Sequence, residues 1–141
     1  SRRATGQAQA QRAKMRLLTL SSGIAAGADG AGTANQTSSM AVCGEVYAIG
    51  ITYNDSPPAT TDVTIATAGT NALAVTLLTV TSANTNAWFY PRAVMQTTAG
   101  ATVTFDGTNE IYGKLAIADY VKVTIAEANA SDSVTVHLLV D

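Results

Sequence analysis

The second half of the chain alternates apolar and polar residues in short runs separated by turn-forming residues. The clearest runs are residues 62–67, 120–126 and 133–140. Successive side chains of a β-strand point to opposite faces, so each run predicts a strand with one buried and one solvent-facing side. The weaker runs that predict further strands are residues 72–81, 101–105 and 110–117.

A local pattern of valine, threonine and a third apolar residue recurs in four of these runs. Its copies begin at Val63, Val103, Val123 and Val134. Their spacing is too irregular for a solenoid, which needs a fixed period. We therefore interpret the pattern as strand alternation, with the threonine outward and the branched apolar residues inward.

The first half of the chain is less regular. Residues 15–21 have the length and composition of a first strand, and residues 40–53 predict a long strand or a bent pair of strands. Gly44 and Gly50 mark candidate β-bulges within that stretch. Residues 22–39 consist mainly of Gly, Ala, Ser, Thr and Asn, which predicts a long surface loop or an extended segment.

Together these runs predict the fold class. Eight or nine short strands without a credible amphipathic helix are typical of an all-β protein, a β-sandwich or jelly roll. A chain of 141 residues fits one such domain. We assign the β-sandwich to residues 15–141 and treat residues 1–14 as a separate N-terminal arm.

Charge divides the chain in the same place. Residues 1–16 hold five bases and no acid, whereas the remaining residues hold three bases and all ten acids. We expect the arm to be flexible and to become ordered only against a partner, because it has little apolar surface to bury. The candidate partner-binding bases are Arg2, Arg3, Arg12, Lys14 and Arg16.

Two interpretations of this basic arm stay open. It is either an anchor for an acidic protein surface or nucleic acid, or a solvated terminus without a role. The acidic remainder of the chain argues against a broad nucleic-acid-binding face. Residues 1–16 also lack the apolar segment of a secretory signal, and no apolar stretch is long enough to cross a bilayer. We therefore expect a native or nearly native start and no membrane partner.

Candidate catalytic chemistry is sparse. His137, the one histidine, lies in an alternating run and is interpreted as a structural or surface residue. Cys43, the one cysteine, lies in an apolar stretch and is predicted to be a small buried residue. One His and one Cys do not provide the usual zinc ligands, and the acids follow neither calcium-loop nor glycosidase spacing. Residues 27–32 are interpreted as a flexible glycine-rich loop. We expect no enzyme activity, metal or cofactor.

Residues 84–92 form the most distinctive local cluster, Asn-Thr-Asn-Ala-Trp-Phe-Tyr-Pro-Arg. Two roles are open for it. Its aromatic residues either fill the core of the sandwich or anchor an interface, since Trp, Tyr and Arg concentrate binding energy at contacts. The candidate interface residues are Trp88, Tyr90 and Arg92.

At these residues the chain resembles a group of small virion proteins of tailed bacteriophages. The resemblance covers roughly residues 15–140, and its most specific part is the Trp-Phe-Tyr-Pro-Arg stretch at residues 88–92. Further matching segments are residues 15–20, 44–49, 62–65, 113–115 and 121–123. The basic extension before Met15 departs from the group.

The resemblance implies a capsid decoration, or cement, protein that binds the outside of an assembled shell. Its partners would be the major capsid protein and neighbouring copies of itself in a homo-oligomeric assembly. Its location would be the virion surface, after synthesis in the host cytoplasm. A charged fraction of only 13% suits a protein packed against others. The alternatives are a neck, tail or fibre component of the virion, or a carbohydrate- or cell-surface-binding β module.

Overall fold

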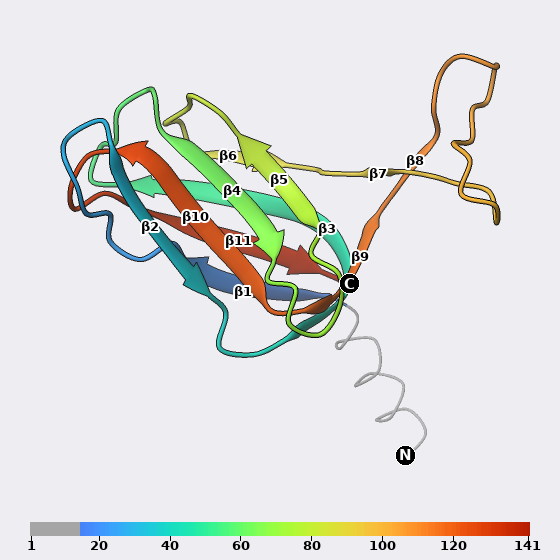
Figure 1. The fold of residues 1–141 in the computed structure, drawn as a ribbon, viewed down its shortest axis with the longest axis horizontal. Coiled ribbons are helices and arrows are strands. Elements are labelled where there is room, and N and C mark those ends of the chain that lie inside the picture. Colours follow the sequence, from blue (N-terminus) through green and yellow to red (C-terminus); the bar gives the residue numbers. More distant parts are fainter. Residues whose placement is uncertain (1–14) are drawn as a thin grey trace, which may run out of the picture.

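The computed structural model describes residues 15–141, which form eleven β-strands and no helix (Figure 1). The all-β class predicted from the alternation is therefore confirmed. The strands are β1 (Arg16–Ser21), β2 (Gly32–Thr37), β3 (Val42–Asn54), β4 (Asp62–Thr67), β5 (Thr76–Val80), β6 (Ala87–Phe89), β7 (Ala93–Val94), β8 (Tyr112–Gly113), β9 (Leu115–Asp119), β10 (Val121–Ala128) and β11 (Ser133–Val140).

The strands form two facing antiparallel sheets, the arrangement of a β-sandwich. The first sheet has the order β1-β11-β3-β6, and β9 also pairs with β3. The second sheet has the order β2-β10-β4-β5. Figure 1 shows the two layers, with β7 and β8 crossing beyond one end of them.

Alternating residues of both sheets form the core. Val123 and Ile125 on β10, and Val134 and Val136 on β11, are fully buried, whereas the threonines between them are only partly buried. The predicted inward and outward alternation therefore holds for these strands. The largest fully buried side chains are Ile49, Ile51, Ile65, Ile125, Leu138, Val46, Val63, Val121, Val123, Val134, Val136 and Val140.

The segment predicted as a loop, residues 22–39, contains strand β2. β2 pairs with β10 in antiparallel register from Thr37 opposite Lys122 to Gly32 opposite Ala128. Gly32 lies so close to the backbone of strand β10 that a Cβ atom there would be 2.9 Å from the Ala128 carbonyl oxygen. β2 is an edge strand of small and polar residues, so it lacks the apolar alternation by which strands are predicted.

The long strand predicted for residues 40–53 is confirmed as β3. Its register against β11 shifts between Ala48 and Val46, so the bulge lies at Tyr47. Gly44 adopts the left-handed φ of +139°, and a Cβ atom there would meet the Asp141 carbonyl oxygen at 2.7 Å. Gly50 is not a bulge, because it pairs regularly with His137 and Trp88.

Residues 91–114 leave the sandwich as an extension that we call the projecting arm (Figure 1). Beyond the short β7–β8 pair, it is held by isolated bridges from Gln96 to Thr102 and from Thr104 to Glu110. The runs 101–105 and 110–113 therefore belong to this arm and not to the sandwich. Phe105, in the third position of the Val-Thr pattern, is 71% exposed. Residues 72–75 likewise precede β5 as a loop.

Candidate interaction surface

Trp88 lies on the outer face of the first sheet. Within β6, Phe89 turns inward and packs against the core, so its neighbour Trp88 turns outward and is 50% exposed. The indole covers Gly50, where a Cβ atom would be 3.1 Å from the ring. The ring centroid of His137 lies 6.3 Å from that of Trp88, and the His137 ring shares a 3.2 Å hydrogen bond with the Thr52 hydroxyl.

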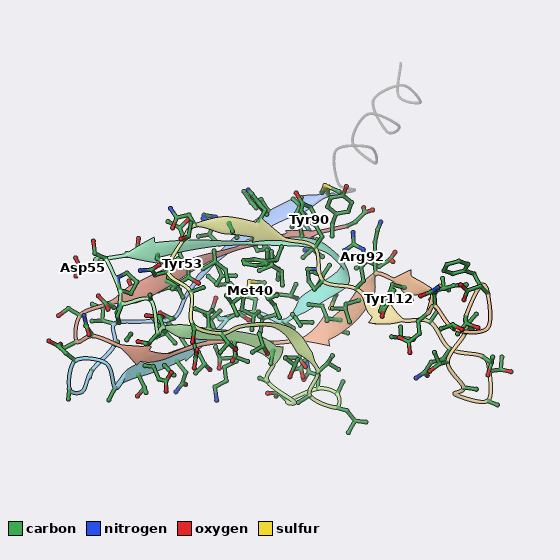
Figure 2. All side chains as sticks on the ribbon, turned by 90° about the horizontal axis from the view of Figure 1, so that it is seen from above. Met40, Tyr53, Asp55, Tyr90, Arg92 and Tyr112 are labelled. Atoms are coloured by element: carbon green, nitrogen blue, oxygen red, sulfur yellow. The ribbon has the colours of Figure 1, made fainter. Side chains whose placement is uncertain are left out.

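Tyr90 continues this surface toward the projecting arm. It is 59% exposed and meets the ring of Tyr47 edge-on at 6.3 Å. The Arg92 guanidinium lies 5.7 Å, and the Lys114 ammonium 5.4 Å, from the centroid of Tyr47, which favours cation–π attraction. Figure 2 shows Tyr90 and Arg92 near the base of the projecting arm.

Arg92 is held in place by the backbone as well. Its Nη1 donates hydrogen bonds to the carbonyl oxygens of Tyr47 at 3.0 Å and Pro91 at 2.8 Å. The guanidinium is therefore oriented before any partner arrives. We define the aromatic face as the exposed residues Tyr47, Trp88, Tyr90 and Lys114 together with half-buried Arg92.

The outer face of the second sheet has a different chemistry. Between the buried residues of β4 and β10, the outward positions carry Asp62, Thr64, Lys122 and Thr124. These are short or charged polar side chains. The sandwich therefore presents one aromatic and one polar face, and the aromatic one is suited to contact with a partner.

The two roles considered for the aromatic cluster are divided among its residues. Phe89 packs against the core, whereas Trp88 and Tyr90 are exposed. Tyr47 and Lys114 were not predicted, because they are far from the cluster in sequence and reach it only through the pairing of β3 with β6 and β9.

Of the five bases predicted for the basic arm, only Arg16 lies in the part of the chain that the structure describes. Arg16 begins β1, and its guanidinium donates a 2.7 Å hydrogen bond to the Cys43 carbonyl oxygen. Arg2, Arg3, Arg12 and Lys14 lie outside the described residues, so the basic arm stays a prediction from sequence.

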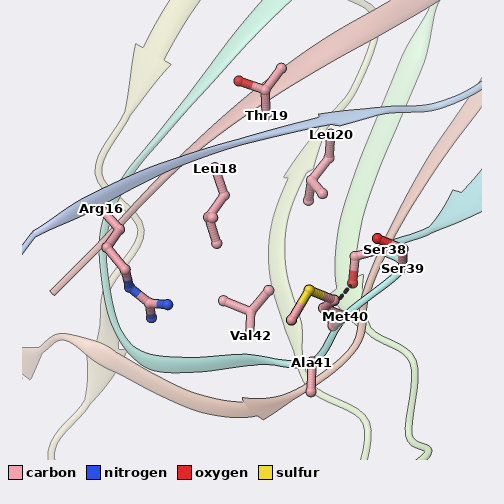
Figure 3. Close-up of a pocket in the computed structure, with 9 residues that line it drawn as sticks. All are labelled: Arg16, Leu18, Thr19, Leu20, Ser38, Ser39, Met40, Ala41 and Val42. Atoms are coloured by element: carbon pink, nitrogen blue, oxygen red, sulfur yellow. Dashed lines mark hydrogen bonds between the residues drawn. The ribbon is translucent and has the colours of Figure 1, made fainter.

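A groove runs between β1 and residues 38–42 (Figure 3). It has a volume of about 240 Å³, and Figure 3 shows Leu18, Leu20, Met40 and Val42 converging on it, with Arg16 at one end. Met40 is 75% exposed. The sequence did not predict this groove, because it lies between β1 and the link from β2 to β3, which are about 20 residues apart in the chain.

Residues 15–141 contain no cluster of three or more His, Cys, Asp or Glu side chains that could hold a metal ion. His137 contacts Thr52 and Trp88. The prediction that Cys43 is buried is wrong: Val42 faces the core, so its neighbour Cys43 faces outward and is exposed.

Comparison with known protein families, curated proteins and solved structures finds no match to this chain. Within the described residues, no helix is long and apolar enough to cross a membrane.

Proposed function

We propose that this chain is a structural virion protein that binds the outside of a phage capsid and stabilises it, as a decoration or cement protein. The observation that carries the proposal is the aromatic face, where Trp88 is 50% and Tyr90 59% exposed and where backbone hydrogen bonds orient Arg92. The sequence resemblance to small phage virion proteins gives this surface its proposed partner. The role requires no catalysis and no cofactor.

The chemistry of the aromatic face suits a protein interface. Trp, Tyr and Arg dominate the residues whose truncation weakens complexes, typically by about 2 kcal/mol or more. That amount corresponds to roughly a 30-fold change in Kd. Trp88 and Tyr47 lie on paired strands β6 and β3, and planar aromatic side chains have few rotatable bonds, so little side-chain freedom is lost on binding.

The test is a titration of the protein onto undecorated shells of the major capsid protein. Trp88→Ala and Tyr90→Ala should each weaken binding about 30-fold, whereas Lys122→Ala on the polar face should bind like the unchanged protein. Circular dichroism must show that each variant is folded. Equal binding by folded variants of both faces would reject the aromatic face as the contact with the shell.

A second candidate, a carbohydrate-binding module, is favoured by one observation. A depression of about 170 Å³ lies beside the Trp88 ring, and its lining includes Thr52, Asn86 and His137. Sugars commonly bind where an aromatic ring lies next to hydrogen-bonding groups. Glycan-array binding that Thr52→Val abolishes would support this candidate, whereas binding to shells without binding to glycans would support the first.

A neck, tail or fibre position would use the same aromatic face with another virion partner. Cryo-electron microscopy of the virion distinguishes these positions, because a decoration protein repeats over the whole shell. Density at the neck or tail alone would reject capsid decoration and keep the structural role.

A further inference from the structure

Beyond its base, where Arg92 and Lys114 contact Tyr47, the projecting arm is separate from the sandwich in its interactions. Among the described residues, every hydrogen bond recorded for residues 95–111 stays within the arm, including Met95 N–H to the Ile111 carbonyl at 2.8 Å. None of residues 95–112 is buried. The arm therefore exposes Met95, Phe105 and Tyr112, large apolar side chains that do not contribute to the core.

The tip of the arm is organised before any contact. The Asp106 carboxylate accepts hydrogen bonds from the backbone N–H groups of Thr108 at 2.9 Å and Asn109 at 2.6 Å. Gly107 supplies a φ of +85°, and Phe105 N–H bonds to the Asn109 carbonyl at 3.1 Å. These bonds fix the turn and leave the Phe105 ring exposed next to a carboxylate.

The groove between β1 and residues 38–42 has the complementary properties. An apolar protein cavity of about 150 Å³ can hold a benzene molecule, so a groove of about 240 Å³ has room for one phenyl ring. Leu18, Leu20 and Met40 provide apolar contacts, and Arg16 lies at the end of the groove. An apolar ring followed by an acid fits such a site.

We propose that Phe105 at the tip of one copy's arm occupies the groove of a neighbouring copy, with Asp106 facing Arg16. A second copy is required because the arm extends away from its own sandwich (Figure 1). The contact joins two different surfaces, so each copy can both give and receive an arm, and contacts can continue from copy to copy.

This inference rests on the proposed function, because attachment to a shell is what brings the copies together. Copies bound side by side on a shell have a high effective concentration, so a contact too weak to assemble a dilute solution can still link them. The ring supplies apolar contact, and the charge pair at the end of the groove favours one orientation.

The test is disulfide trapping between two versions of the full chain, both carrying Cys43→Ser. One version carries Thr108→Cys at the arm tip, and the other carries Met40→Cys at the groove. Mixed at high concentration and oxidised, they should form a mixed dimer at least ten times faster than a matched mixture in which Lys122→Cys replaces Met40→Cys. Trapping at the rate of the Lys122 control would overturn the proposal.

Two further changes test the chemistry of the contact. Phe105→Ala in the tip version should reduce trapping to the rate of the control, and Arg16→Gln in the groove version should slow it several-fold. Circular dichroism verifies that each version is folded. Trapping that does not depend on Phe105 would overturn the proposal. Trapping that occurs only after residues 1–14 are removed would also overturn it, because the groove would then be assigned to the chain's own N-terminal segment.

Shell binding separates this contact from the proposed function. At low occupancy of a bare shell, bound copies are far apart. If folded Phe105→Ala protein binds less well under these conditions, and the trapping experiment gives no mixed dimer, the arm contacts the shell and not another copy. That result would overturn the inference and leave the decoration role intact. Trapping without any shell binding would reject the decoration role and keep the contact between copies.

Discussion

At Gly50, the lack of a side chain makes room for Trp88. A Cβ atom at this position would lie 3.1–3.2 Å from three ring atoms of the indole. We therefore predict that Gly50→Ala displaces the Trp88 ring and lowers the free energy of unfolding by about 1–3 kcal/mol, as overpacking does. Tryptophan fluorescence and urea unfolding measure the two effects.

The matched control is a double-mutant cycle. In a Trp88→Ala background the added methyl group no longer meets a ring, so Gly50→Ala should cost much less there. An equal loss of unfolding free energy in both backgrounds would show that the backbone conformation, and not the space needed by the indole, requires glycine at position 50.

Tyr53 carries a buried polar atom without a hydrogen-bond partner in the described part of the chain. Its hydroxyl is buried, and no group of residues 15–141 forms a hydrogen bond with it. Burial also raises the pKa of Tyr53 above its ordinary value of 10.0. Because an unsatisfied buried polar group costs about 1–3 kcal/mol, we predict that Tyr53→Phe is neutral or raises Tm in calorimetry.

Thr61 provides the comparison for Tyr53. It is fully buried, but its hydroxyl donates a 2.7 Å hydrogen bond to the Pro58 carbonyl oxygen. Thr61→Val should therefore lower the free energy of unfolding by about 0.5–1.5 kcal/mol. A Tyr53→Phe variant that loses as much as Thr61→Val would contradict the assignment of the Tyr53 hydroxyl as unsatisfied.

Single residues were harder to predict from sequence than the runs that contain them. Cys43 lies in an apolar stretch and Phe105 ends an alternating run, yet both side chains are exposed. The side of the strand decides the first case, because Val42 already faces the core. The second depends on the position of residues 91–114 outside the sandwich, which no local pattern encodes.

At the scale of elements, one carboxylate connects β9 to the loop between β4 and β5. Asp119 is 1% exposed and accepts backbone hydrogen bonds from Gly69 at 2.9 Å, Asn71 at 3.1 Å and Tyr120 at 2.7 Å. Desolvation by burial raises the pKa of Asp119, but these bonds outweigh it, and the pKa lies below its ordinary value of 3.8.

The direction of this shift predicts an acid-sensitive contribution to stability. A carboxyl whose pKa is lower in the folded state stabilises the fold above its unfolded pKa, and this stabilisation is lost as the pH falls through the folded value. We predict that Asp119→Asn lowers Tm at pH 7 and that its difference from the unchanged protein shrinks below pH 3.8.

Thermal melts from pH 7 to pH 2 test the prediction for Asp119. The exposed acid Asp29 supplies the control, since Asp29→Asn should leave Tm nearly unchanged at pH 7. A Tm loss in Asp119→Asn that is as large at the lowest pH as at pH 7 would assign the effect to packing and not to the carboxylate charge.

The predictability of each element follows from its burial. β10 and β11 lie inside their sheets, with one side against the core, so their sequences alternate and both were predicted closely. β2 is an edge strand with one neighbour and mostly polar residues, and its pairing depends on β10, about 90 residues away. The aromatic face was predicted only in part for the same reason, because Tyr47 and Lys114 join it through long-range pairing.

At the scale of the whole molecule, the sandwich should fold without the projecting arm. The hydrogen bonds of residues 95–111 are internal to the arm, and none of these residues is buried. We predict that replacing residues 95–111 with a two-residue Asn-Gly turn leaves the far-ultraviolet circular dichroism of the body and its Tm within a few degrees of the full chain. Removing residues 76–80, which include buried Leu77 and Val80, should instead unfold it. Loss of folding in the shortened-arm protein would show that the arm supports the sandwich.

The charge distribution leads to a last prediction at the same scale, about attachment to a shell. Residues 1–14 carry four bases and no acid, whereas the remaining chain is acidic. If these bases bind an anionic surface, their contribution should weaken with salt, because the Debye length falls from about 10 Å at 0.1 M to about 3 Å at 1 M. Deleting residues 1–14 should therefore weaken attachment to bare shells at low salt and have little effect at high salt.

Arg92→Ala on the aromatic face, where rings contribute apolar contact, should weaken attachment at both salt concentrations. Equal binding of the deleted and full-length proteins at every salt concentration would assign attachment to the folded body alone.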